Sequence, residues 1–90
     1  MVKHYKITVS GKVQGVFFRA NTKKVADKLG IKGFVRNEAN GNVYIEAEAD
    51  GPILDEFTQW CRKGPDAAVV SGLKQTEGEI KGFGNFLISR

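Results

Sequence analysis

Residues 10–19, SGKVQGVFFR, combine two glycines with one cation. Gly11 and Gly15 permit backbone torsions that turn successive N–H groups towards one point, and a following helix adds the free N–H groups of its first turn. Such a group of donors binds a tetrahedral anion, and Arg19 can add two parallel hydrogen bonds to the same anion. A plain strand-to-helix turn with an exposed arginine fits the same residues. From the residues alone, both interpretations stay open.

Other side chains offer little for catalysis. His4 is the only histidine and stands near the N-terminus, so we expect it at the surface and exclude a histidine-based triad or metal cluster. Cys61, the only cysteine, falls on the apolar side of a predicted helix and is expected to be buried. Glu46 and Glu48 could form a carboxylate pair, but a water-exposed sheet face explains them more simply. We therefore predict no metal site and no cofactor.

Composition and charge narrow the class of protein. The 90 residues include 14 lysines and arginines against 10 acidic residues, a formal net charge of +4. This length is typical of one domain, residues 1–90. The cations are scattered, which favours small anionic molecules over a nucleic-acid-binding stripe. The N-terminus contains no continuous apolar run, so neither a signal peptide nor a membrane span is expected, and with one unpaired cysteine the sequence indicates a cytoplasmic protein.

Two periodicities organise the chain. Alternating apolar and polar residues predict strands, and apolar residues three and four apart predict helices, the first ended by Gly30 and the second capped by Asp50. Asn40-Gly41 predicts the tight turn of a hairpin. Phe57 and Trp60 are expected in the core, which leaves no apolar surface for an interface, so we expect a monomer. The predicted segments are strands 4–10, 33–37, 42–49, 68–76 and 85–89, a helix 20–29, and a helix between Asp50 and Gly64.

This order, β-α-β-β-α-β with a short C-terminal strand, is the α+β, ferredoxin-like split βαβ plan. An antiparallel sheet with both helices on one face would bury one set of alternating residues and leave the other face in water. Many unrelated activities use this fold, so the fold alone implies no function.

Two motifs resemble those of a known family. Residues 11–19, GKVQGVFFR, resemble the signature of the acylphosphatases, a Gly-x-Val-Gln-Gly-Val-x-Phe-Arg run after the first strand. Residues 30–43, GIKGFVRNEANGNV, are similar to a second family segment, Gly-aromatic-Val-x-Asn followed by a turn and a Val-led strand. Nine adjacent positions make the first motif specific, whereas the second alone would be weak. Departures are minor: Phe34 stands where the family often has tryptophan, and Asn40 where aspartate is usual.

The resemblance implies an enzyme that hydrolyses acyl phosphates, mixed anhydrides of carboxylic and phosphoric acid, to a carboxylate and inorganic phosphate. Phosphate would then be product and inhibitor, and no metal would be needed. By position, Arg19 corresponds to the phosphate-binding arginine of the family and Asn37 to the asparagine that holds the attacking water. The apolar side chains of the loop are expected to anchor it to the domain. Backbone amides would complete the phosphate site: those of Gly15, Val16, Phe17, Phe18 and Arg19.

Two alternatives keep the fold and change the function. Residues 81–88, KGFGNFLI, resemble the aromatic octapeptide of RNA-recognition motifs. However, Asn85 and Ile88 stand where stacking aromatics belong, and Glu46 and Glu48 would repel RNA phosphates, so no nucleic acid is expected as a partner. The other alternative is a non-catalytic domain of the acylphosphatase type that binds an anion or a protein. Hydrolysis of an acyl phosphate distinguishes the enzyme from both.

Overall fold

The computed structural model describes residues 1–89, and Arg90, the last residue of the predicted domain, lies outside the described residues. The elements follow the order that the sequence predicts. Several strands are longer than predicted, because cross-strand pairing continues through charged residues that break the apolar alternation. The elements are β1 (Val2–Lys12), α1 (Phe18–Leu29), β2 (Lys32–Asn37), β3 (Val43–Asp50), α2 (Gly51–Lys63), β4 (Val69–Gly78) and β5 (Phe86–Ile88).

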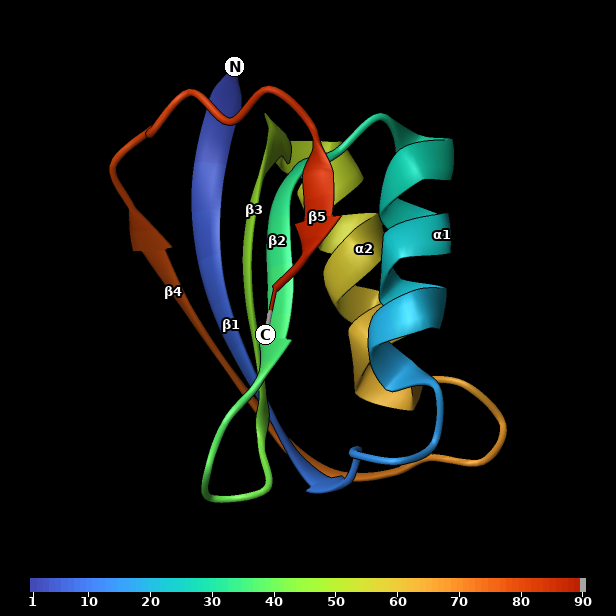
Figure 1. Ribbon diagram of the computed structural model, residues 1–90. Coiled ribbons are helices and arrows are strands. Elements are labelled where there is room, and N and C mark those ends of the chain that lie inside the picture. The colour runs from blue at the N-terminus through green and yellow to red at the C-terminus, as the bar shows by residue number, and fades with distance from the viewer. Residues whose placement is uncertain (90) are drawn as a thin grey trace.

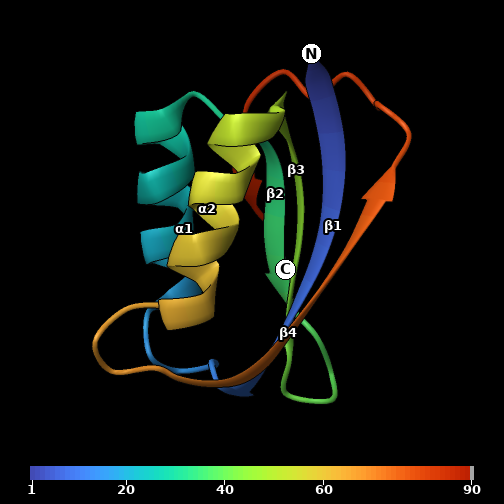
Figure 2. The same cartoon turned by 180° about the vertical axis from the view of Figure 1, so that it is seen from behind.

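The strands form one sheet in the order β4-β1-β3-β2-β5 (Figure 1). β1 pairs antiparallel with β3 and β4, and β2 pairs antiparallel with β3. The pairing of β5 with β2 is parallel, so the prediction of a wholly antiparallel sheet is wrong at this edge. The chain crosses from β4 at one edge to the opposite edge before β5 begins, and β5 therefore runs beside β2 in the same direction (Figures 1 and 2). The α+β, ferredoxin-like arrangement itself is confirmed.

Both helices lie side by side on one face of the sheet, as predicted (Figure 2). The core between the two layers includes Ile7, Ile45 and Phe57, each fully buried. Cys61 is also buried there, and burial raises the pKa of its thiol, so it remains protonated. Trp60 is only half-buried, contrary to prediction, because it lies at the edge of the helix layer against Phe18, with the two ring centroids 5.6 Å apart.

Helix ends follow the sequence signals in part. Gly30 ends α1 with a left-handed φ of 73°, and its N–H donates to the carbonyls of Ala26 and Asp27. Asp50 occupies the position before α2, but its side chain caps no N–H group of the helix. Its carboxylate instead lies 3.2 Å from the N-terminal ammonium of Met1. In place of the predicted capping bond, Asp50 therefore forms an ion pair with the N-terminus of the chain, one residue before β1.

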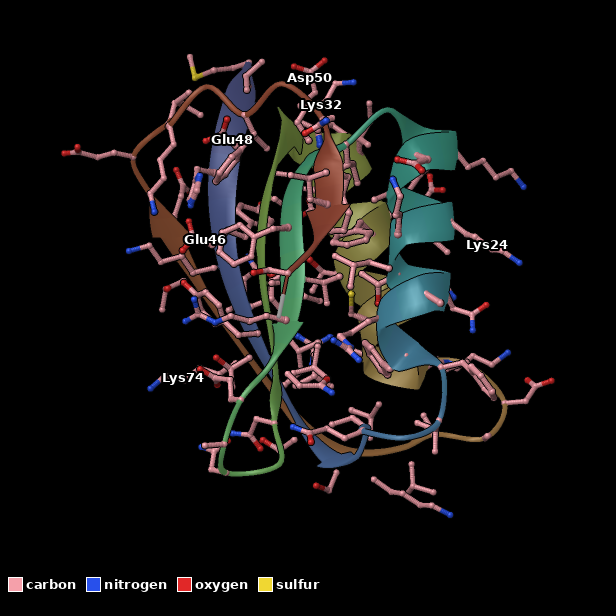
Figure 3. The ribbon with its side chains drawn as sticks, in the orientation of Figure 1. Lys24, Lys32, Glu46, Glu48, Asp50 and Lys74 are labelled. Carbon is pink, nitrogen blue, oxygen red and sulfur yellow. The ribbon has the colours of Figure 1, made fainter. Side chains whose placement is uncertain are left out.

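The second face of the sheet is partly covered, which corrects two predictions. His4 is 0% exposed, and Glu46 and Glu48 are 5% and 6% exposed, although a surface histidine and solvated carboxylates were expected. Antiparallel pairing places His4 directly opposite Glu48. The segment between β4 and β5 then crosses over them, and Figure 3 shows both glutamates on the side of the sheet away from the helices. The burial depends on this crossing segment, which no local sequence pattern announces.

Glu48 fastens the crossing segment to the sheet. Its carboxylate accepts hydrogen bonds from three consecutive N–H groups of residues 81–83, at 2.6, 3.1 and 3.2 Å, and lies 2.7 Å from Nδ1 of His4. On the other side of the ring, Nε2 of His4 lies 2.9 Å from Glu46, which the Lys81 ammonium also approaches at 2.8 Å. Burial alone would raise the pKa of both carboxyls, but these donors outweigh it and hold the pKa of Glu46 and Glu48 below the usual value.

Candidate active site

The sheet topology brings two distant segments to one place. β1 and β2 are both antiparallel to β3, so they run in the same direction. Their C-terminal ends therefore lie at the same end of the sheet. The loop after β1 and the turn after β2 lie together there, at the lower end of the sheet in Figures 1 and 2. Arg19 stands in the first turn of α1, and Asn37 is the last residue of β2. The two motifs found in the sequence therefore converge.

Left-handed backbone shapes the loop between β1 and α1. Gly15 has a φ of 72°, and Phe17 has a φ of 61°, a conformation that is rare for a bulky residue. Val16 and Phe18 are buried and anchor the loop, as predicted. Phe17 does not, because 77% of its surface is exposed. The chain thus has two left-handed positions within three residues immediately before the helix begins.

The N-terminus of α1 offers free donors. Phe17 is the residue before the helix, no side-chain hydrogen bond caps that end, and the first turn contains no acidic residue. The N–H of Asn21 is the first to return to the helix, bonding to the carbonyl of Phe17 at 3.1 Å. The preceding N–H groups have no acceptor within the helix and mark the positive end of its dipole. These features favour an anion at this end.

A cavity of about 320 Å³ opens at this end of α1. Five of the residues predicted for the site line this cavity: Gly15, Phe17, Phe18, Arg19 and Asn37. Val16 does not line the cavity because its side chain is buried in the core. The remaining lining residues, which the sequence reasoning missed, are Val13, Ala20 and Ile88.

Asn37 and Arg19 both line this cavity, and their polar groups are complementary, an acceptor and a set of donors. The amide oxygen Oδ1 of Asn37 is buried and has no hydrogen-bond partner among residues 1–89. A buried acceptor without a donor is costly, so this atom is suited to accept a hydrogen bond from a bound molecule. Within the same range, the hydrogen bond of the Arg19 guanidinium is a long one, 3.5 Å from Nη1 to the carbonyl of Ser89. Its other N–H groups can reach an anion in the cavity.

Comparison with known proteins identifies the family. The family model for acylphosphatase matches residues 5–88. The acylphosphatase of Thermotoga petrophila is 45% identical over 87 residues, covering 97% of each chain, and that of Methylococcus capsulatus is 40% identical over 99% of this chain and 98% of its own. The chain belongs to the acylphosphatase family. The crystal structure of acylphosphatase from Bacillus subtilis superposes with a TM-score of 0.95 over all of both chains, at 34% identity.

In the protein described here, the C-terminal strand β5 and the residue after it contribute to the candidate site, which the sequence did not indicate. Ile88 lines the cavity, and the carbonyl of Ser89 accepts from Arg19. Both residues reach the site because β5 pairs parallel with β2, with Ile88 beside Val35. A three-residue strand carries no periodicity that could reveal this pairing, and only an expectation of parallel pairing at this edge would have found it.

Within residues 1–89, no three side chains of histidine, cysteine, aspartate or glutamate are grouped so as to hold a metal ion. The polar side chains among the residues that line the cavity are the guanidinium of Arg19 and the amide of Asn37, which bind anions and water. Neither α1 nor α2 combines the length and apolar character that a membrane span requires.

Proposed function

We propose that the protein hydrolyses acyl phosphates to a carboxylate and inorganic phosphate, with Arg19 and the loop amides holding the phosphoryl group and Asn37 positioning the attacking water. One observation carries the proposal: Asn37, whose Oδ1 is buried and has no hydrogen-bond partner among residues 1–89, lines the same cavity as Arg19 and Gly15. A water that donates to Oδ1 directs a lone pair away from Asn37, towards the anion at the helix end. Family membership supplies the substrate class.

The backbone and Arg19 would provide the electrostatic part of the reaction. Phosphoryl transfer depends mainly on positioning and on stabilising charge on the three equatorial oxygens. The N–H groups of residues 15–19 and the guanidinium of Arg19 are fixed donors that need not reorganise as charge develops. Arg19 can bind two oxygens at once, which a lysine ammonium cannot do with the same geometry.

The reaction needs no general acid. The water oxygen forms a bond to phosphorus, and the bond between phosphorus and the acyl oxygen breaks, releasing a carboxylate. This leaving group departs unprotonated, because carboxylic acids have a pKa of about 4. The amide of Asn37 is far too weak a base to take the proton of the water, so it orients the water while a phosphoryl oxygen of the substrate accepts the proton. The site therefore requires neither histidine nor cysteine.

The test is hydrolysis of benzoyl phosphate by the purified protein in the presence of EDTA. We expect turnover with competitive inhibition by inorganic phosphate. Arg19→Lys should lower kcat/KM by about 100- to 1,000-fold, as loss of an oxyanion donor does, and should weaken phosphate inhibition. Phosphate binding without hydrolysis in the wild type would favour the non-catalytic alternative, and unchanged phosphate inhibition in Arg19→Lys would refute the role of Arg19.

A further inference from the structure

We propose that Gln14 is a positioning residue that fixes the phosphate-binding loop relative to Asn37. The proposal rests on the function proposed above, because it concerns the distance between the group that would hold phosphate and the group that would hold water. Gln14 itself is not among the residues that line the cavity. It would act through its two neighbours in the structure, the loop and the end of β2.

The side-chain amide of Gln14 joins the two segments directly. Its Nε2 donates to the carbonyl of Glu38 at 2.7 Å and to the carbonyl of Asn42 at 2.9 Å. An amide nitrogen has two N–H groups, so both are used. Each bond crosses from the loop after β1 to the turn after β2, and Gln14 is half-buried between them. These bonds are short and join residues far apart in the sequence, which makes them a specific tie between the segments.

The places that Gln14 connects are adjacent in the chain to the proposed catalytic groups. Gln14 directly precedes Gly15, whose left-handed φ of 72° starts the proposed phosphate site. Glu38 directly follows Asn37. The turn itself is closed by a hydrogen bond from the N–H of Glu38 to the carbonyl of Asn42 at 2.8 Å, so it moves as a unit. A shift of the loop relative to this turn would change the distance between bound phosphorus and the water on Asn37.

The chemistry of the tie requires two donors on one short side chain. Both partners are carbonyls, so a glutamate of the same shape would place acceptor against acceptor. Leucine would fill a similar volume without any donor. Lysine is slightly longer, but its ammonium can donate to both carbonyls at once. These three substitutions separate donor capacity from shape, which a single alanine variant cannot do.

The first experiment compares Gln14→Glu, Gln14→Leu and Gln14→Lys for kcat and for inhibition by phosphate. Misplacement by about 1 Å can cost about 100-fold in rate. We therefore expect kcat for benzoyl phosphate to fall about 10- to 100-fold in the glutamate and leucine variants, and to be largely rescued in the lysine variant. The inhibition constant for phosphate should change less than about threefold. Gln59→Glu, an exposed change of the same kind on α2, is the matched control and should behave as wild type.

A double-mutant cycle tests whether Gln14 acts through Asn37. In the Asn37→Ala background, Gln14→Leu should lower kcat little further, because the group that it positions is already gone. Multiplicative effects in the cycle would overturn the proposal and leave Gln14 a binding or folding residue. So would a lysine variant as impaired as the leucine variant, or leucine and glutamate variants with wild-type kcat.

A readout that does not depend on turnover keeps this proposal separable from the proposed function. Amide hydrogen exchange of Glu38 and Gly41, whose N–H groups bond within the turn, should be faster in Gln14→Leu than in the wild type, by about tenfold if loss of the two bonds loosens the turn. Exchange in α2 should stay unchanged. Unchanged exchange of these two turn amides would refute the tie even if the enzyme were active. Faster exchange with no hydrolysis by the wild type would instead refute the proposed function and retain the tie.

Discussion

Replacing Glu48 with glutamine should destabilise the fold strongly, although the side chain keeps its shape. One carboxylate oxygen accepts from the N–H groups of Gly82 and Phe83, and the other accepts from the N–H of Lys81 and faces Nδ1 of His4. Glutamine has one acceptor oxygen and an NH₂ group. Whichever way the amide is turned, at least one of the three N–H groups of residues 81–83 then faces another donor.

The size of the effect follows from that lost hydrogen bond. A hydrogen bond to a charged group contributes about 1.5–3 kcal/mol, so the loss of one lowers the free energy of unfolding by at least about 1.5 kcal/mol. In a domain of this size, that change lowers the Tm by roughly 6 °C or more. The assay is urea denaturation of Glu48→Gln at pH 7, with Glu56→Gln, an exposed glutamate on α2, as the matched control. The control should stay within about 0.5 kcal/mol of wild type.

The same experiment repeated at lower pH checks the electrostatic cause. The pKa of Glu46 and of Glu48 is lower in the folded protein than usual, so the folded state favours their charged forms. Their contribution to the free energy of unfolding is complete above the unfolded pKa of about 4.3 and is lost as pH falls through the lower, folded values. Wild type should lose stability below about pH 4.5 more steeply than Glu48→Gln. Equal stability of the two proteins at pH 7, or equal slopes in acid, would refute the account of this cluster.

Two further predictions concern the loop and its ligand. Phe17→Asn should raise the free energy of unfolding by about 0.5–1 kcal/mol, because asparagine adopts a left-handed φ more readily and the ring of Phe17 is largely exposed. Urea denaturation measures this change. A free energy of unfolding below that of the wild type would mean that the ring packs against the protein in solution. Inorganic phosphate at a hundred times its Kd should stabilise the wild type by about 2.7 kcal/mol in thermal unfolding. At the same phosphate concentration, Arg19→Lys should lose most of this stabilisation. Equal stabilisation of both proteins would show that phosphate binds elsewhere.

Local patterns in the sequence predict the elements, because periodicity, the glycine that ends the first helix and the hairpin turn are local signals. Gly15 and Arg19 mark the loop as a candidate anion site from the residues alone. Asn37 follows only from the resemblance to the acylphosphatases, since no local pattern connects the end of its strand with the loop. The cavity in the structure is lined by Arg19 and Asn37, as the resemblance implied.

What the sequence could not predict depends on the path of the chain after β4. The segment that crosses the sheet buries His4, Glu46 and Glu48, and the parallel strand that follows brings Ile88 to the cavity. Residues in this segment have no apolar period, and their order in space is set by three N–H groups that bond to one distant carboxylate. Alternation along β3 correctly indicated a polar face, but the sequence of that strand alone does not reveal what covers the face.

The central claim is that Asn37 positions water while Arg19 and the loop hold phosphate. The most direct test measures kcat for benzoyl phosphate and the inhibition constant of phosphate in Asn37→Ala. We expect kcat to fall about 100- to 1,000-fold, the cost of removing a group that acts in the transition state, with phosphate inhibition unchanged within about threefold. A loss of phosphate affinity as large as the loss of kcat would make Asn37 a binding residue and contradict the account.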